Sequence, residues 1–160
     1  MNGILVGIKY KQVSIINNQQ PSRINICEDV FFVLVHWLFK EVRTLQKIKM
    51  ILNQLKTSPV TIDFKEVISY IDGHYDFTPT KFTNGNTVNE ADQNNGSCKI
   101  FSFGKLNELS KDDTLALFGA FYREDVMKNP EGTDHQNIRN FMEFGWEGIS
   151  FEGKALRSRF

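Results

Sequence analysis

The sequence predicts a single small domain of the α/β or α+β class, in which several helices surround a short-stranded sheet. Three observations support this prediction. The chain has 160 residues, enough for one domain with its own hydrophobic core. Apolar residues recur at helical spacing in segments that begin with capping residues and stop at Gly or Pro. Short runs between these segments alternate from face to face, as strands do.

The amino-acid composition limits the classes of function that this protein can have. Hydrophobic residues are 41% and charged residues 24%, typical of a soluble globular protein, and 14 Phe predict a core dominated by aromatic packing. The net charge is zero, so nothing global indicates a nucleic-acid or membrane-surface partner. The two cysteines are too few for a disulfide framework, and no C-x-x-C or H-E-x-x-H motif is present. We therefore expect no metal and no cofactor.

The zero net charge hides a division at Met50. Residues 1–49 hold seven basic and three acidic residues, a net +4, whereas residues 50–160 hold 12 basic and 16 acidic residues, a net −4. Residues 1–49 are interpreted either as an N-terminal helix packed on the domain or as an extension outside the natural protein, which would then start at Met50. A short strand is expected at residues 4–10. One long helix is expected from Phe31 to Leu55, closed by Pro59.

The apolar run at residues 30–39 is about ten residues long, too short to span a bilayer as a helix. The next predicted helix covers residues 62–75, with Asp63 and Glu66 at capping-box spacing. A long polar stretch at residues 75–99 follows. Within it, Asn84-Gly85 and Asn94-Asn95-Gly96 each predict a tight turn.

The remaining elements follow the same rules. Cys98–Phe103 is predicted as a strand, because its side chains would alternate between two faces. A helix from Ser110, capped through Asp113, is expected to continue through Val126 and to stop at Asn129-Pro130. Another should run from Thr133 or Asp134 to Phe144, with Gly145 after its last turn. A short strand is expected at residues 148–151, before a basic tail at residues 157–160.

Several motifs occur in order along the chain: Phe77-Thr78-Pro79-Thr80, Asn84-Gly85, Gly96-Ser97-Cys98-Lys99, Asp134-His135, Asn137-Ile138-Arg139 and Gly145-Trp146. By these motifs the chain resembles, over residues 50–156, the HopJ family, named after a type III effector of plant-pathogenic bacteria. The resemblance implies a small α/β domain and a role as a protein injected into host cells. The resemblance does not point to any catalytic residue or to any ligand. The family commonly has Gly where this chain has Asp92, a residue type that tolerates left-handed backbone.

Three groups of side chains are candidates for chemistry. Cys98 with His135 or His74 would form a nucleophile and base, but a buried structural thiol is the commoner situation. Asp134 and His135 would serve as acid, base or ligands, or Asp134 simply caps a helix. Arg123 and Arg139 would bind a carboxylate or phosphate, or form structural ion pairs, for Arg123 with Asp134 or Glu143.

A fourth candidate is a ligand groove along the polar stretch. Its wall would be Tyr70, Tyr75, Phe77 and Phe82, with Asn84, Asn89 and Asn94 on its rim. Alternatively, these aromatic rings only hold the loop in place and the Asn side chains bond their own backbone.

Two functions follow from these candidates. The first is a HopJ-like effector that acts through contacts with a host or bacterial protein, without turnover. It would lie in the bacterial cytoplasm or be secreted into a host cell. The second is a cytoplasmic enzyme or small-ligand-binding protein, with its site between the 75–99 loop and the helix that starts near Asp134. The second function requires Cys98, His135 and Arg139 to converge on one concavity.

Overall fold

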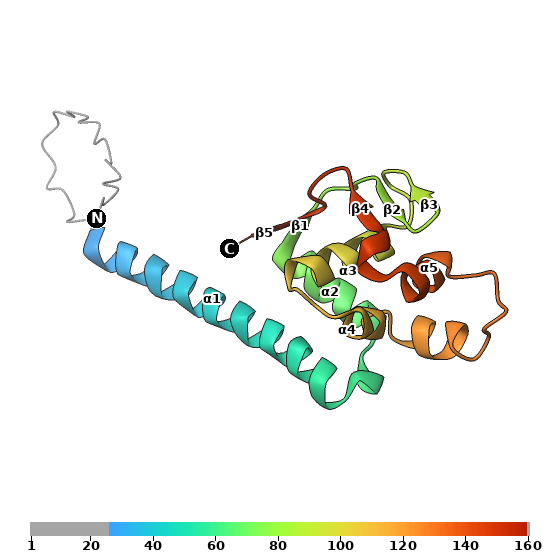
Figure 1. Ribbon diagram of the computed structural model, residues 1–160. Coiled ribbons are helices and arrows are strands. Elements are labelled where there is room, and N and C mark those ends of the chain that lie inside the picture. Colours follow the sequence, from blue (N-terminus) through green and yellow to red (C-terminus); the bar gives the residue numbers. More distant parts are fainter. Residues whose placement is uncertain (1–25, 160) are drawn as a thin grey trace, which may run out of the picture. The chain divides into compact units, whose positions relative to one another are not determined.

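The computed structural model describes residues 26–159, and Figure 1 shows its helices and strands. The chain divides into two compact units, residues 1–36 and residues 37–160, and the division falls within helix α1 (Ile26–Thr57). The predicted helix over residues 31–55 is therefore confirmed. It ends before Pro59, which opens the 3₁₀ helix η1 (Pro59–Thr61). The strand predicted at residues 4–10 lies outside the described residues, and the separate origin of residues 1–49 stays a prediction.

The second unit is an α+β domain, which confirms the predicted fold class. Its two small sheets are antiparallel throughout: β1 pairs with β5, and β2 lies between β3 and β4. None of the described helices is both long enough and apolar enough to cross a membrane. In chain order its elements are α2 (Phe64–His74), β1 (Tyr75–Phe77), β2 (Phe82–Asn84), β3 (Thr87–Asn89), α3 (Asn95–Leu106), α4 (Lys111–Ala116), the π-helical η2 (Phe121–Val126), α5 (Gln136–Phe144), the 3₁₀ helix η3 (Gly145–Gly148), β4 (Ile149–Phe151) and β5 (Leu156–Ser158).

Local signals located most of these elements. The Asp63 side chain accepts a hydrogen bond from the Glu66 amide at 3.0 Å and so caps α2 as predicted. Asn84-Gly85 lies at the turn between β2 and β3, and β4 forms where the last strand was expected. The expected basic tail begins with β5, whose Leu156 lies opposite Phe77 of β1.

The strand predicted at Cys98–Phe103 is wrong, because these residues form the middle of α3. Consecutive residues from Ile100 to Gly104 are all buried, so no face of this segment is exposed to alternate with a buried one. A helix surrounded by other elements is apolar all round, and a short run of that kind has no readable period. The turn predicted at residues 94–96 is wrong for the same reason, since Asn95 and Gly96 belong to the first turn of this helix.

Helix α3 carries the centre of an aromatic core. The Phe101 ring lies 4.8 Å from the ring of Phe141, 5.4 Å from Phe118 and 6.1 Å from Phe82, measured between centroids. Phe101, Phe82 and Phe141 are fully buried. Rings at these separations and tilts contribute beyond the area that they bury. The predicted aromatic core is thus built around one helix that contacts α2, α4 and β5.

The single helix predicted from Ser110 to Val126 is also wrong in part, because it breaks at Gly119. Gly119 has φ +59°, and a Cβ there would lie 2.8 Å from the backbone nitrogen of Phe64 and 3.0 Å from the carbonyl oxygen of Ile62. The chain therefore passes directly against the start of α2 at this point. The predicted cap is confirmed, since Ser110 Oγ accepts from the Asp113 amide at 3.1 Å.

Helix α5 starts later than predicted. Its first residue is Gln136, and the residue before it is His135 in a left-handed conformation with φ 48°. Asp134 therefore does not cap the helix. Asp92 also has left-handed backbone, φ 69°, as expected for an Asp in a place where the family commonly has Gly.

We predict that Gly119→Ala destabilises the domain. Left-handed backbone costs a non-Gly residue roughly 1–3 kcal/mol, and the clash with Phe64 and Ile62 adds to this cost. Gly73→Ala is the matched control, because a Cβ on Gly73 meets nothing within 4 Å. In the helix α2 this second change should stabilise by up to about 1 kcal/mol. Urea unfolding of both variants checks the contrast, and equal effects of the two substitutions would contradict it.

Candidate functional site

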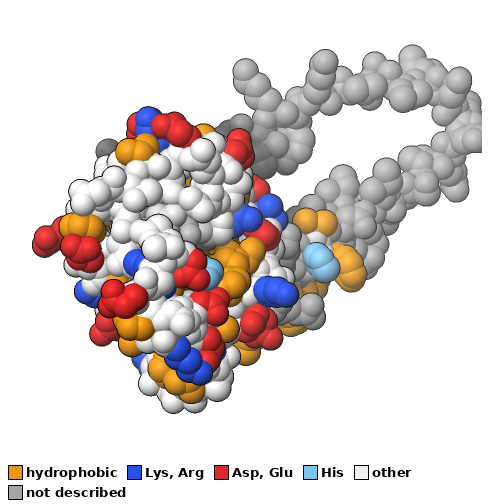
Figure 2. Space-filling view, turned by 90° about the vertical axis from the view of Figure 1, so that its right-hand side faces the viewer, with side chains coloured by type: hydrophobic (Ala, Val, Ile, Leu, Met, Phe, Trp, Pro, Cys, Tyr) orange, Lys and Arg blue, Asp and Glu red, His pale blue; other side chains and the backbone are white. Residues whose placement is uncertain are grey.

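A groove of about 370 Å³ lies between the first turns of α3 and α5, and we call it the α3–α5 groove. It lies where the second function considered above places its site. The lining residues come from the end of the polar stretch (Asn94, Gly96 and Ser97) and from the start of α5 (His135, Gln136 and Asn137). Figure 2 views the molecule from the right-hand side of Figure 1, and apolar patches lie there among acidic, basic and white surface.

Phenylalanine rings form the apolar part of the groove. The Phe64 ring meets Phe121 edge-on with centroids 5.1 Å apart, and it stacks with Phe118 at 6.3 Å. Phe121 is 38% exposed, so part of its ring remains free to contact a ligand. A Cβ on Gly96 would lie 3.0 Å from the tip of the Phe64 ring. A side chain at this position would therefore push against the Phe64 ring, which would have to shift by a few tenths of an ångström.

Two helix N-termini open onto the groove. The residues before α3 and α5, Asn94 and His135, both have left-handed backbone, with φ 52° and 48°, and neither makes a side-chain cap. The first amides of a helix have no acceptor within the helix. In the groove these amides belong to residues such as Gly96, Ser97 and Gln136. The groove is thus a source of N–H donors with the positive end of two helix dipoles.

His135 lines the groove and lies close to two carboxylates. Its Nε2 lies 3.2 Å from Asp125 Oδ2 and 3.9 Å from Asp134 Oδ2, and its ring lies 5.1 Å from the Phe121 ring. The imidazole is half-buried, and His135 is one of the residues that line the groove.

The two candidate arginines have structural partners. Arg139 donates to Asp134 through two hydrogen bonds of 2.8 Å, from Nε to the backbone oxygen and from Nη2 to Oδ1. This hydrogen bond to the side chain is the main reason that the pKa of the Asp134 carboxyl lies below its usual value. Arg123 donates to the Ile62 carbonyl at 3.0 Å, not to Asp134 or Glu143. Neither arginine lines the α3–α5 groove.

A buried network of asparagines fixes the floor of this region. Asn137 is its centre: its Oδ1 accepts from Asn84 and Asn89 at 3.1 Å, and its Nδ2 donates to Asn89 Oδ1 at 2.8 Å. Asn94 Nδ2 donates to the same Asn89 oxygen at 2.7 Å. Asn140 donates to the Asn84 carbonyl at 3.0 Å. The network ties β2 and β3 to the start of both helices.

Cys98 lies elsewhere. Its side chain is 1% exposed, its Sγ donates to the Thr80 carbonyl at 3.6 Å, and burial raises the pKa of the thiol. A raised pKa keeps sulfur in the weakly nucleophilic thiol form. Cys98 does not line the groove that contains His135. The structure therefore brings His135 and Asn94 to one groove but leaves Cys98 and Arg139 outside it.

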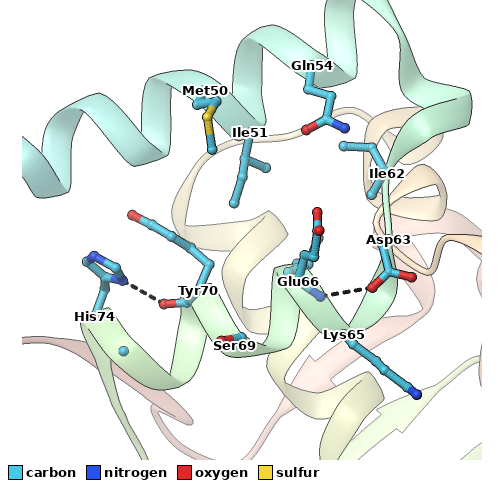
Figure 3. A pocket seen from close by; sticks show the side chains of 12 residues that line it. Met50, Ile51, Gln54, Ile62, Asp63, Lys65, Glu66, Ser69, Tyr70 and His74 are labelled. Carbon is cyan, nitrogen blue, oxygen red and sulfur yellow. Dashed lines mark hydrogen bonds between the residues drawn. The ribbon is translucent and has the colours of Figure 1, made fainter.

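His74, the other base considered for Cys98, lies in a second cavity of about 540 Å³ between α1 and α2. Figure 3 shows its ring beside Tyr70, with Nδ1 2.7 Å from the Tyr70 carbonyl oxygen. The two rings stack at 4.2 Å. Cys98 does not line this cavity.

The aromatic candidates belong mainly to the core. Phe82 is fully buried against Phe151 at 5.4 Å, and Tyr75 packs edge-on against Phe103 at 5.9 Å. Phe77 is half-buried, with Lys99 Nζ 4.8 Å from its ring centre. Among the described residues, no group of three or more His, Cys, Asp or Glu side chains is arranged to hold a metal ion.

Several groove residues were not candidates in the sequence. Phe64, Phe118 and Phe121 all line the groove, and none of them was among the candidates. Asn137 entered only through the family motif. The sequence signal that these residues share is weak. Three phenylalanines lie near segments that are rich in Asn or contain His, and they form a site only because the break at Gly119 brings them together.

A family model described as HopJ type III effector protein matches residues 48–156, so the chain belongs to the HopJ type III effector family. A comparison with curated proteins gave no match. One solved structure, described as the crystal structure of unknown function protein VPA0580, is 58% identical with a TM-score of 0.68 and covers 69% of this chain and 92% of that chain. The resemblance stated from the sequence is thereby confirmed.

We predict that Asn137→Ala lowers the free energy of unfolding by roughly 1–3 kcal/mol, because the buried Asn89 Nδ2 loses its acceptor, whereas Asn84 Nδ2 keeps its 2.6 Å hydrogen bond to the Asn137 backbone oxygen. The control is Asn53→Ala on the exposed side of α1, which should change stability little. Chemical denaturation measures both. A loss at Asn137 no larger than at Asn53 would show that the network does not stabilise the fold.

A second prediction concerns acid titration. Arg139→Gln should raise the pKa of Asp134 toward its usual value, because the side-chain hydrogen bond that favours the carboxylate is lost. In the natural chain this interaction stabilises the fold above the usual pKa of an Asp and fades as the pH falls through the lowered value. Carboxyl ¹³C NMR titration measures the change. Lys128→Gln is the control, since it should raise the pKa of Glu124 and leave Asp134 unchanged.

Proposed function

We propose that this HopJ family protein is secreted into a host cell as a type III effector and acts there by binding another protein, without turnover. The observation that carries the proposal is the α3–α5 groove, which lies within the residues matched by the effector family. The groove combines partly exposed phenylalanine rings with backbone N–H donors. This combination suits recognition of a polypeptide segment better than it suits a reaction.

The chemistry of the groove supports binding. A segment in extended conformation offers carbonyl oxygens to the helix-end amides and apolar side chains to the rings of Phe64 and Phe121. Of the residues considered as nucleophile and base, only His135 lines the groove, and Asp125 lies within ion-pair distance of it. The thiol of Cys98 faces Thr80 instead.

The groove is also held in shape before any partner arrives. Asn94 and Asn137 both line it, and both are joined to Asn89 through hydrogen bonds of 2.7 and 2.8 Å. A site whose residues are already ordered loses less entropy on binding. We therefore expect binding to leave the backbone of α3 and α5 in place.

The binding test uses the full chain as bait in host-cell extract and then each captured protein in purified form. Phe121→Ser removes an exposed groove ring, and Met127→Ser is the control, since Met127 is 52% exposed and does not line the groove. We expect Phe121→Ser to weaken the purified complex by at least about 10-fold, the effect of losing an aromatic anchor. Met127→Ser should not change it. Calorimetry measures the affinities, after unfolding midpoints show that both variants are folded.

Two outcomes would contradict the proposal: no partner retained by the natural chain under any condition, or a partner that binds Phe121→Ser as tightly as the natural chain. Secretion is tested separately with a translocation reporter fused to the full chain in its native host. A reporter signal that depends on the type III apparatus is expected. Absence of that apparatus from the host would make the effector role untenable.

A further inference from the structure

A second groove, of about 640 Å³, lies between the end of α3 and the segment that joins β4 to β5. We call it the basic groove. Its charged lining residues are all cationic: Lys105 from α3, Lys154 from the connecting segment and Arg157 from β5. All three are exposed. No Asp or Glu lines it.

The three cations lack acidic partners, which sets them apart from the other basic residues near the sheets. Lys105, Lys154 and Arg157 form no ion pair within the described residues. Elsewhere Lys81 pairs with Glu90 at 3.2 Å, Lys99 with Asp72 at 2.6 Å and Arg159 with Asp76 at 2.7 Å. Unpaired charges concentrated in one groove produce a positive potential there.

Two carboxylates near the basic groove, those of Asp76 and Glu152, pair with cations outside it. Asp76 lies opposite Arg157 in the β1–β5 pair, but its Oδ1 accepts from Arg159 Nε at 2.7 Å. Glu152, just before the connecting segment, lies 3.5 Å from Lys81 Nζ. The positive groove therefore persists in a part of the chain, residues 50–160, that has four more acidic than basic residues.

The remaining lining is largely apolar. Leu106 is 55% exposed, Phe151 is half-buried, and Leu156 is buried beneath them in β5. An occupant that fits this lining carries carboxylates for the cations and apolar side chains for the leucine and phenylalanine surfaces. Both features occur together in a short acidic segment of a protein.

We propose that the basic groove docks an acidic, apolar-containing segment of a partner protein, with its carboxylates on Lys105, Lys154 and Arg157. Charge complementarity selects the segment and speeds its association, while contact with Leu106 and Phe151 adds affinity. The groove shares no lining residue with the α3–α5 groove, so this docking stands or falls independently of the function proposed above.

The test is an NMR titration of the full chain with the pentapeptide acetyl-Glu-Leu-Glu-Phe-Glu-amide. We expect shifts at the amides of Lys105, Lys154 and Leu156, and an affinity that falls as salt is raised. The reversal variant Lys105→Glu/Lys154→Glu/Arg157→Glu should bind at least about 10-fold more weakly, because like charges now face each other. Its matched control is Lys49→Glu/Lys56→Glu/Lys65→Glu, which changes the net charge equally at exposed lysines outside the groove. The control should bind like the natural chain.

Further titrations distinguish the acidic segment from other occupants of the basic groove. The peptide acetyl-Lys-Leu-Lys-Phe-Lys-amide should not shift these amides. Equal weakening in the two charge variants would overturn the proposal, since it would reduce the effect to net charge. Shifts with decanoate but not with the acidic peptide would also overturn it, because the groove would then take a small anionic amphiphile. Circular dichroism of each variant ensures that a loss of binding is not a loss of folding.

Discussion

The rest of this site depends on the hydrogen bonds that the buried side-chain amide of Asn137 makes with Asn84 and Asn89. This amide joins the β2–β3 hairpin to the start of α5, with partners 53 and 48 residues away in the sequence. Amide groups placed away from water must find partners inside the protein or cost free energy. Each arrangement of these segments that breaks the network leaves several such groups unpaired. The asparagines therefore select one geometry for the polar stretch, where a purely apolar contact would tolerate several.

The hydrogen bonds of the asparagine network determine the shape of the α3–α5 groove. Asn94 is tied to Asn89, which fixes the point where α3 begins, and Asn137 fixes the point where α5 begins. The left-handed backbone of Asn94 and His135 turns the chain into each helix at these points. Gly119 brings Phe118 and Phe121 against the start of α2, completing the apolar side. Donors and rings thus meet because of contacts made outside the groove.

Local signals in the sequence were sufficient where structure is local. The caps at Asp63 and Ser110, the turn at Gly85 and the strand at residues 149–151 were all predicted. Tertiary contacts decided the rest. The core position of α3 hides its helical period, and the break at Gly119 depends on a backbone that lies 55 residues earlier in the chain. The groove lies between the two segments that the second hypothesis named, and its role as a site stays a prediction. Its phenylalanines were not predicted, because no local pattern indicates which apolar rings remain exposed.

Side-chain hydrogen exchange tests most directly whether the asparagine network is formed and persists in solution. The carboxamide protons of Asn137 and Asn89 should have dispersed NMR shifts and exchange with solvent far more slowly than those of Asn53, which is exposed on α1. Exchange of Asn137 and Asn89 at the rate of Asn53 would contradict the account, because the groove would then lack the support that gives it a fixed shape.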